Sequence, residues 1–134
     1  MDGNSRGIIL FADNDAGILE IYQKIFERDL PNYPVEFFSD GNSLKKRLEG
    51  LVNGTDRIKI VITDNQMPGV SGREIIAKYS GKKESENIYF ILFSVCSNDI
   101  AREVEDKYGA KYLPKNVDID YFMGFIKQTL GEGI

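Results

Sequence analysis

Residues 59–72 read Lys-Ile-Val-Ile-Thr-Asp-Asn-Gln-Met-Pro-Gly-Val-Ser-Gly. The three β-branched apolar residues at 60–62 are typical of a strand that is buried on both faces of a parallel sheet. The run stops at one acidic residue, Asp64, and the Pro-Gly pair at 68–69 then marks a loop. The stretch predicts a carboxylate at the carboxyl end of a buried strand, which is the edge of an open α/β sheet where ligands bind. Acids are also common in turns after strands, so this stretch alone leaves the function of Asp64 open.

The bulk properties describe one soluble globular domain. The chain has 134 residues, of which 42% are hydrophobic and 28% are charged, so we expect a single domain over residues 1–134. The net charge of −4 argues against a nucleic-acid partner, and no stretch approaches the ~20 apolar residues that a membrane span needs. The only cysteine, Cys96, cannot form an internal disulfide, which favours a reducing, cytoplasmic location.

Strands and helices are predicted to alternate five times. The predicted strands are 7–12, 35–38, 57–63, 88–93 and 110–113, and the predicted helices are 16–29, a segment after Asp40 that closes at Asn53-Gly54, 71–80, 98–108 and a last helix from Asp118. Regular alternation with short connections predicts βαβ units and a parallel sheet. Residues 81–87 are predicted to form a loop. The buried face of the last helix is expected to hold Tyr121, Phe122, Phe125, Ile126 and Leu130.

Polar side chains follow four of the predicted strands. They are the Asp-Asn-Asp run at 13–15, Asp64, Ser94 and Lys115. Because the carboxyl ends of parallel strands share one edge, we expect these groups to converge if their strands are neighbours. Carboxylate and amide oxygens suit Mg²⁺, and an ammonium and a hydroxyl would contact the oxygens of a phosphoryl group. A carboxylate could itself be the nucleophile and form an acyl phosphate.

Two other readings use the same residues. Asp13 and Asp15 could be plain loop or capping acids, with Asp15 at the start of the first helix. Alternatively, the Asp-x-Asp form could mark a phosphohydrolase, with Asp13 as the nucleophile and Asp15 as the acid/base. The chain lacks the later acidic pair and the cap expected of that fold. No Gly-x-x-x-x-Gly-Lys-Ser/Thr stretch exists, which disfavours a P-loop nucleotide binder.

The chain resembles the receiver (CheY-like) domain of two-component response regulators over nearly its whole length. The resemblance rests on the 8–15 and 60–72 segments, on Ser94 with its strand, and on Gly-Ala-Lys-Tyr-Leu-Pro-Lys at 109–115. Asp-x-x-Met-Pro-Gly-x-x-Gly from Asp64 is its most specific piece. The resemblance implies a flavodoxin-like (βα)5 fold, a doubly wound parallel five-stranded sheet with strand order 2-1-3-4-5. It also implies a phosphoprotein of a phosphorelay, here with no attached output domain.

The resemblance assigns roles to individual residues. Asp64 would be the phosphoacceptor that forms an aspartyl phosphate, and Ser94 and Lys115 would contact the phosphoryl group. Mg²⁺ would be held by Asp13, Asn14, Asp64 and the backbone carbonyl of Gln66. Ser94 and Tyr112 would form the switch that repacks a face made by the fourth helix, the fifth strand and the fifth helix, which would bind a downstream protein target. Gln66 and Cys96 occupy positions where the family tunes the lifetime of the acyl phosphate.

The phosphoryl donor would be a sensor histidine kinase or a histidine phosphotransfer protein. The chain has no histidine, so a phosphohistidine must come from such a partner.

Two departures from the family pattern leave an alternative open. Asn14 stands where the family has a second acid, so we expect weaker Mg²⁺ binding and slower phosphoryl chemistry. Asn116 replaces the proline after the lysine, so the Lys115–Asn116 bond is predicted to be trans. Both departures are compatible with a receiver-like scaffold that works without phosphorylation.

Overall fold

The computed structural model describes residues 7–50 and 57–131. Its strands are β1 (Ile8–Ala12), β2 (Val35–Phe38), β3 (Ile58–Thr63), β4 (Tyr89–Ser94) and β5 (Lys111–Pro114). Its helices are α1 (Ala16–Asp29), α2 (Gly41–Glu49), α3 (Gly72–Tyr79), α4 (Asn98–Arg102) and α5 (Ile119–Thr129), with a 3₁₀ turn η3 (Lys83–Ser85) and a π-helical segment η4 (Glu103–Lys107). The predicted alternation of strands and helices is confirmed.

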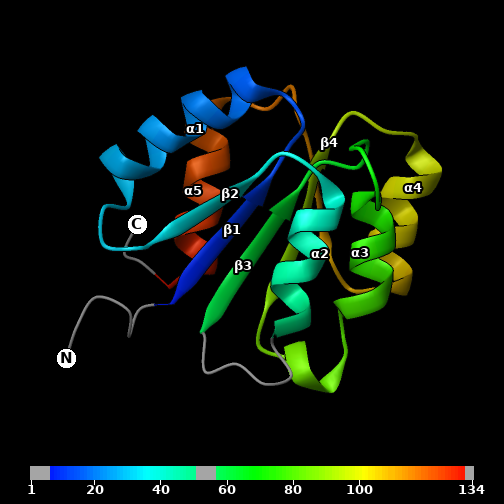
Figure 1. The fold of residues 1–134 in the computed structure, drawn as a ribbon. Helices are drawn as coiled ribbons and strands as arrows, with labels where there is room; N and C mark the ends of the chain where they lie inside the picture. Colours follow the sequence, from blue (N-terminus) through cyan, green and yellow to red (C-terminus); the bar gives the residue numbers. More distant parts are fainter. Residues whose placement is uncertain (1–6, 51–56, 132–134) are drawn as a thin grey trace.

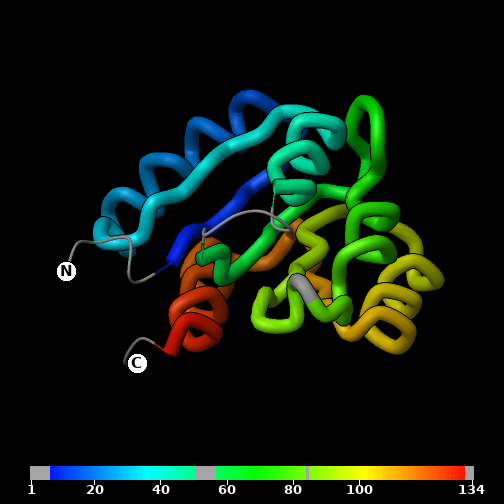
Figure 2. The backbone as a smooth tube through the Cα atoms, turned by 60° about the horizontal axis from the view of Figure 1, so that its bottom comes forward, coloured from blue at the N-terminus to red at the C-terminus, as the bar shows by residue number. Residues whose placement is uncertain are grey.

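The five strands form one parallel sheet in the order β2-β1-β3-β4-β5, which is the predicted flavodoxin-like order. Helices α1 and α5 cover one face of the sheet, and α2, α3 and α4 cover the other (Figures 1 and 2). The chain order reverses between β1 and β3, so this pair marks the topological switch point of the sheet.

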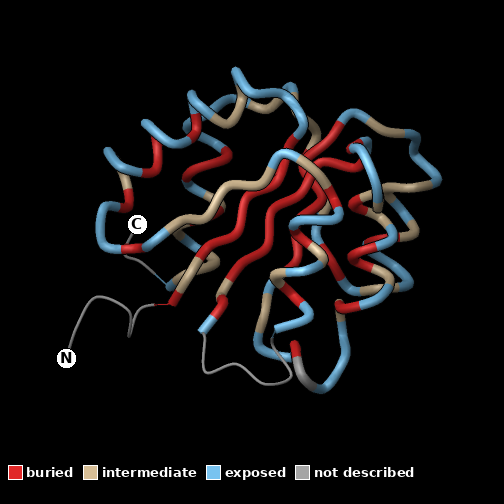
Figure 3. The backbone as a smooth tube through the Cα atoms, in the orientation of Figure 1, coloured by how far each residue is buried: buried red, intermediate tan, exposed pale blue. Residues whose placement is uncertain are grey.

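The central strands are buried on both faces, as their apolar runs predict. Ile60, Val61 and Ile62 of β3 are each 0% exposed, and the buried strands form the middle layer of Figure 3. Successive side chains of a strand point to opposite faces, so Ile60 and Ile62 pack with α1 and α5 while Val61 packs with α2 and α3. This places a rigid, dry sheet beneath the polar residues at its carboxyl edge.

Several predicted boundaries were wrong. Helix α2 ends at Glu49 with Gly50 as its C-cap, earlier than predicted, and Asn53-Gly54 lies outside the described residues. The predicted helix 98–108 is α-helical only to Arg102 and continues as the π-helical η4. The loop predicted over 81–87 contains η3.

The buried face of α5 is centred one residue further along than the sequence pattern predicts. Phe122, Met123 and Ile126 are buried, whereas Tyr121 is 57% exposed, so its assignment to the buried face was wrong. Phe125 and Leu130 are only partly buried. Residues at positions i, i+1 and i+4 point to one side of a helix, which leaves Tyr121 on the opposite side.

Candidate functional site

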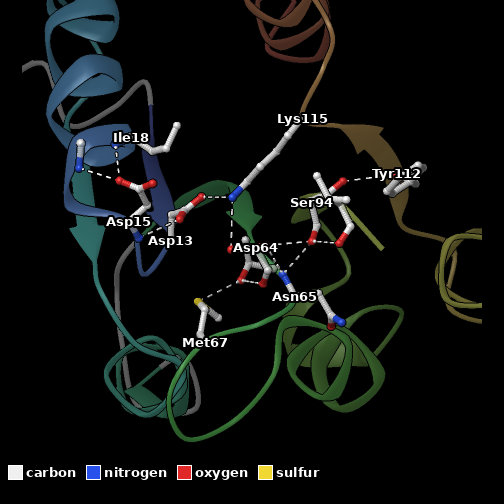
Figure 4. Close-up of polar contacts among 12 residues, drawn as sticks. Asp13, Asp15, Ile18, Asp64, Asn65, Met67, Ser94, Tyr112 and Lys115 are labelled. Atoms are coloured by element: carbon white, nitrogen blue, oxygen red, sulfur yellow. Dashed lines mark hydrogen bonds and ion pairs between the residues drawn. The ribbon is translucent and has the colours of Figure 1, made fainter. Parts of the chain in front are cut away.

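Strand register brings the predicted site residues together. Ala12 of β1 pairs with Thr63 of β3, and the N–H of Asp64 donates to the carbonyl of Ala12 at 2.9 Å, so Asp13 and Asp64 leave neighbouring strands side by side. Ser94 ends β4 on the other side of β3, where it pairs with Pro114 of β5. Lys115 follows Pro114 directly. The four groups share one edge of the sheet, at its switch point (Figure 4).

The carboxylate of Asp64 is buried and held from several directions. The residue is 6% exposed. Its Oδ1 accepts a hydrogen bond from Ser94 Oγ at 2.8 Å and another from the N–H of Asn65 at 2.7 Å. Its Oδ2 lies 3.2 Å from Lys115 Nζ. These donors fix the orientation of the carboxylate and concentrate positive potential at it.

Lys115 links the two acids of the site. Its Nζ lies 2.6 Å from Asp13 Oδ2, while Asp13 Oδ1 accepts a hydrogen bond from the N–H of Asp15 at 2.9 Å. Burial raises the pKa of the Asp13 carboxyl above its ordinary value, and the contact with Lys115 offsets this only in part. Burial by itself would lower the pKa of Lys115. The hydrogen bond to Asp13 and the charge of Asp13, with a smaller contribution from Asp64, outweigh burial and raise the pKa of Lys115.

Ser94 is also connected to the predicted switch residue. The hydroxyl of Tyr112 donates to the backbone carbonyl of Ser94 at 3.1 Å, so the ring lies half-buried against the end of β4. Burial raises the pKa of Tyr112, and the neighbouring Cys96 thiol acts in the same direction. Burial likewise raises the pKa of Cys96, which keeps its thiol protonated at neutral pH. The hydroxyl of Ser94 therefore touches Asp64 while its carbonyl touches Tyr112.

The remaining predicted residues lie at the rim of the site. Asn14 and Gln66 are exposed. Asp15 is the N-cap of α1, because its Oδ1 accepts from the N–H groups of Gly17 at 2.8 Å and Ile18 at 3.2 Å. Its Oδ1 is thus bound to the helix end, which favours the capping role over the acid/base role that the phosphohydrolase reading assigns to Asp15.

The donor set fits Mg²⁺, although it is sparse. Asp13 Oδ2 and Asp64 Oδ2 already share one cation, the ammonium of Lys115, so both oxygens face a common cation position. Among the described residues, no group of three or more His, Cys, Asp or Glu side chains is arranged to hold a metal. Mg²⁺ is usually held by one or two carboxylates and keeps several waters, so two acids with neutral oxygens from Gln66 and Asn14 are a sufficient set.

Asn65 belongs to the site although no sequence pattern predicted it. This residue is 9% exposed, and its N–H lies 3.3 Å from Ser94 Oγ in addition to its contact with Asp64. A polar residue directly after a strand-end acid carries no distinctive pattern, so only its position next to Asp64 could have drawn attention to it. The Lys115–Asn116 bond is trans, as predicted.

Within residues 7–50 and 57–131, no helix combines the length and apolar character that a bilayer crossing requires.

Comparison with known proteins gives a consistent assignment. The family model described as response regulator receiver domain matches residues 9–127. No significant match was found among curated proteins. The fold is similar to a signal receiver domain of a DNA-binding response regulator from Colwellia psychrerythraea 34H, with a TM-score of 0.80 and 18% identity over 94% of this chain and 99% of that chain.

Two further solved structures agree. A signal receiver domain of an HD domain-containing protein from Pseudomonas fluorescens Pf-5 has a TM-score of 0.76 and 20% identity over 94% of this chain and 95% of that chain. A CheY-like receiver domain protein from Methanospirillum hungatei JF-1 has a TM-score of 0.72 and 21% identity over 93% and 94%. At these identities the likeness shows the fold, whereas the family model covers most of the sequence. The chain belongs to the response regulator receiver domain family of two-component systems.

Proposed function

We propose that Asp64 accepts a phosphoryl group from a phosphohistidine of a sensor histidine kinase or a histidine phosphotransfer protein. The supporting observation is the buried Asp64 carboxylate with Ser94 Oγ, the Asn65 N–H and Lys115 Nζ arranged around it. The histidine belongs to the partner, because this chain has none. One carboxylate oxygen bonds to phosphorus while the P–N bond breaks and its electron pair stays on the imidazole, which leaves an aspartyl phosphate on this chain.

The chain's own residues supply positioning and charge. Lys115 neutralises the oxygens of the incoming phosphoryl group, and Ser94 and the Asn65 N–H donate hydrogen bonds to them. Asp13, Asp64 and the backbone carbonyl of Gln66 would hold Mg²⁺, with Asn14 as a neutral neighbour. When bound, Mg²⁺ neutralises the negative charge that gathers on the phosphoryl oxygens.

The Ser94–Tyr112 contact suggests how the site communicates. Phosphorylation draws the Ser94 hydroxyl toward the new phosphoryl oxygens and disturbs the carbonyl that Tyr112 now binds. Tyr112 then repacks the face made by α4, β5 and α5, where Tyr121 is 57% exposed and Ile119 is 40% exposed. We assign this face to a downstream protein target, without nucleic-acid or membrane contact, in the cytoplasm.

Labelling by a small phosphodonor tests the proposal. Wild-type protein incubated with acetyl phosphate and Mg²⁺ is expected to gain one phosphoryl group by mass spectrometry, and Asp64→Asn is expected to gain none. Asp15→Asn is the matched control, because its side chain caps α1 and points toward the start of that helix in Figure 4. Label retained in Asp64→Asn, or lost in Asp15→Asn alone, would refute the assignment and favour the phosphohydrolase.

Asn14 is exposed and stands where the family has an acid, which favours a second candidate function. This function is a scaffold that works without phosphorylation. Beryllofluoride, a phosphoryl mimic, separates the two in a titration at millimolar Mg²⁺ monitored by NMR. The phosphorylation proposal requires shifts at Asp64 and Tyr112, whereas the scaffold predicts an unchanged spectrum.

A further inference from the structure

Asn65 connects the acceptor residue to the start of α3. On one side, its backbone N–H donates to Asp64 Oδ1 at 2.7 Å and lies 3.3 Å from Ser94 Oγ. On the other side, its carbonyl accepts from the N–H of Gly72 at 3.0 Å and its side-chain Oδ1 accepts from the N–H of Arg73 at 3.0 Å. In Figure 4 the side chain points away from the Asp64 carboxylate. Asn65 is thus held at three polar atoms, and two of those contacts go to a helix.

These contacts complete the first turn of α3. The first N–H groups of a helix have no partner inside the helix. Asn65 satisfies those of Gly72 and Arg73, and the N-cap Ser71 satisfies that of Glu74 at 3.1 Å. The position of Asn65 is therefore fixed relative to α3, because both its backbone carbonyl and its side-chain Oδ1 accept hydrogen bonds from that helix.

The same turn of α3 lies directly against the acceptor residue. A Cβ on Gly72 would stand 2.1 Å from the carbonyl oxygen of Asp64, so only glycine permits this approach. The backbone of Asp64 is therefore packed on α3, and the peptide that follows it has α3 as its support.

We propose that the side chain of Asn65 is a positioning residue for the chemistry at Asp64, an inference that rests on the proposed function. By anchoring on the Arg73 N–H, Oδ1 prevents rotation of the Asp64–Asn65 peptide and holds its N–H aimed at Asp64 Oδ1 and Ser94 Oγ. A donor that is already in place where negative charge develops needs no rearrangement during the reaction. When the anchor is removed, the Asn65 carbonyl still accepts from Gly72 and the Asp64 carbonyl still accepts from the Thr63 hydroxyl at 2.8 Å. The peptide then has more freedom to rotate, so its N–H points away from Asp64 Oδ1 in part of the population.

Three variants test the inference by acetyl phosphate labelling with Mg²⁺. Asn65→Ala removes the anchor, and Asn65→Asp keeps an oxygen for the Arg73 N–H at the favourable positive end of α3. Ser71→Ala is the matched control, because it removes the neighbouring cap of the same helix and leaves the contacts of Asn65 in place. Far-ultraviolet circular dichroism and melting curves establish that each variant is folded, and labelling is measured over a range of donor concentrations.

The saturating labelling rate of Asn65→Ala is expected to fall about tenfold, with little change in the donor concentration at half-saturation. Asn65→Asp and Ser71→Ala are expected to stay within about twofold of wild type. Equal rates in Asn65→Ala and wild type, an equal loss in Ser71→Ala, or no rescue by Asn65→Asp would overturn the role of the side chain. Failure of the wild type itself to be labelled would instead refute the proposed function, and this inference with it.

Discussion

Lys115 Nζ lies 2.6 Å from Asp13 Oδ2, closer than the 3.2 Å that separates it from Asp64 Oδ2. The lysine that should meet the phosphoryl group is thus paired most closely with the acid that should hold the metal. Asp13 is 1% exposed, so its charge has little access to solvent and depends on a cation from the protein or from solution. If Mg²⁺ binds as proposed, Lys115 and the metal ion would compete for the same carboxylate oxygen of Asp13.

Lys115→Met should tighten Mg²⁺ binding. Removal of the ammonium leaves the two carboxylates without their internal cation, so we expect a Kd about tenfold lower in isothermal titration calorimetry. Lys111→Met, an exposed change on β5, serves as the control and should leave the Kd unchanged. An unchanged or weaker affinity in Lys115→Met would mean that the lysine and the metal do not share the site.

Asp13→Asn should stabilise the fold at neutral pH without Mg²⁺. Burial raises the pKa of Asp13 in the folded state, so its favourable contribution is present below the unfolded pKa of about 3.9 and is lost as pH rises through the folded pKa. Loss of the Asp13 charge that raises the pKa of Lys115 opposes this gain. We therefore expect the variant to be more stable by at most about 1 kcal/mol in urea unfolding at neutral pH, with the difference vanishing near pH 3. Asp106→Asn, at an exposed position, should show no such trend. A lower free energy of unfolding for Asp13→Asn than for wild type at neutral pH would contradict the predicted direction of the effect.

Asn14→Asp should strengthen the metal site. The substitution adds a negative charge beside Asp13 at the exposed rim, where an amide oxygen now stands. We expect a Kd for Mg²⁺ about threefold to tenfold lower, a modest gain because the position is exposed to solvent. Unchanged affinity would show that residue 14 points away from the bound ion.

Gly72→Ala should damage both stability and labelling. The new Cβ would stand 2.1 Å from the Asp64 carbonyl oxygen, and the backbone on both sides cannot yield easily. We expect a loss of about 2–3 kcal/mol in the free energy of unfolding. Gly124→Ala is the matched control in α5, where a Cβ meets nothing within 4 Å, and it should gain about 0.5–1 kcal/mol from helix propensity. Similar effects of the two substitutions would show that α3 does not pack tightly on Asp64.

Glu103→Gln should make local opening of η4 more frequent, with only a small change in the global free energy of unfolding. Glu103 forms a two-point ion pair with Arg73 of α3 at the junction where the α-helical α4 becomes π-helical. Elsewhere in η4, Glu105 accepts a hydrogen bond from the N–H of Tyr112 at 2.9 Å. The Arg73 side chain is 39% exposed, so we expect less than about 1 kcal/mol in global stability. Amide hydrogen exchange over residues 103–107 should accelerate severalfold. Asp106→Asn is the control, and equal exchange in both variants would argue against a role for the ion pair.

Local sequence patterns were sufficient for the architecture. The alternation of apolar strands and amphipathic helices predicted the parallel sheet. Asp13, Asp64 and Ser94 were identified because each directly follows a predicted strand, and Lys115 because it follows the last predicted strand after one proline. Such patterns record which residues are buried and where an element stops, because those properties repeat along the chain with the period of the element.

Other features depend on contacts between distant parts of the chain, which no local period records. The sequence could not tell that α5 is turned so that Met123 rather than Tyr121 is buried, or that α4 widens at Glu103 where Arg73 reaches it. It also could not tell that Asn65 bridges Asp64 and α3. By itself, the sequence determined the alternation of strands and helices and the polar groups that follow the strands, while the strand order 2-1-3-4-5 was predicted from the family resemblance. Only the tertiary structure decided which of those groups touch, because strand register and side-chain reach select the partner of each charge.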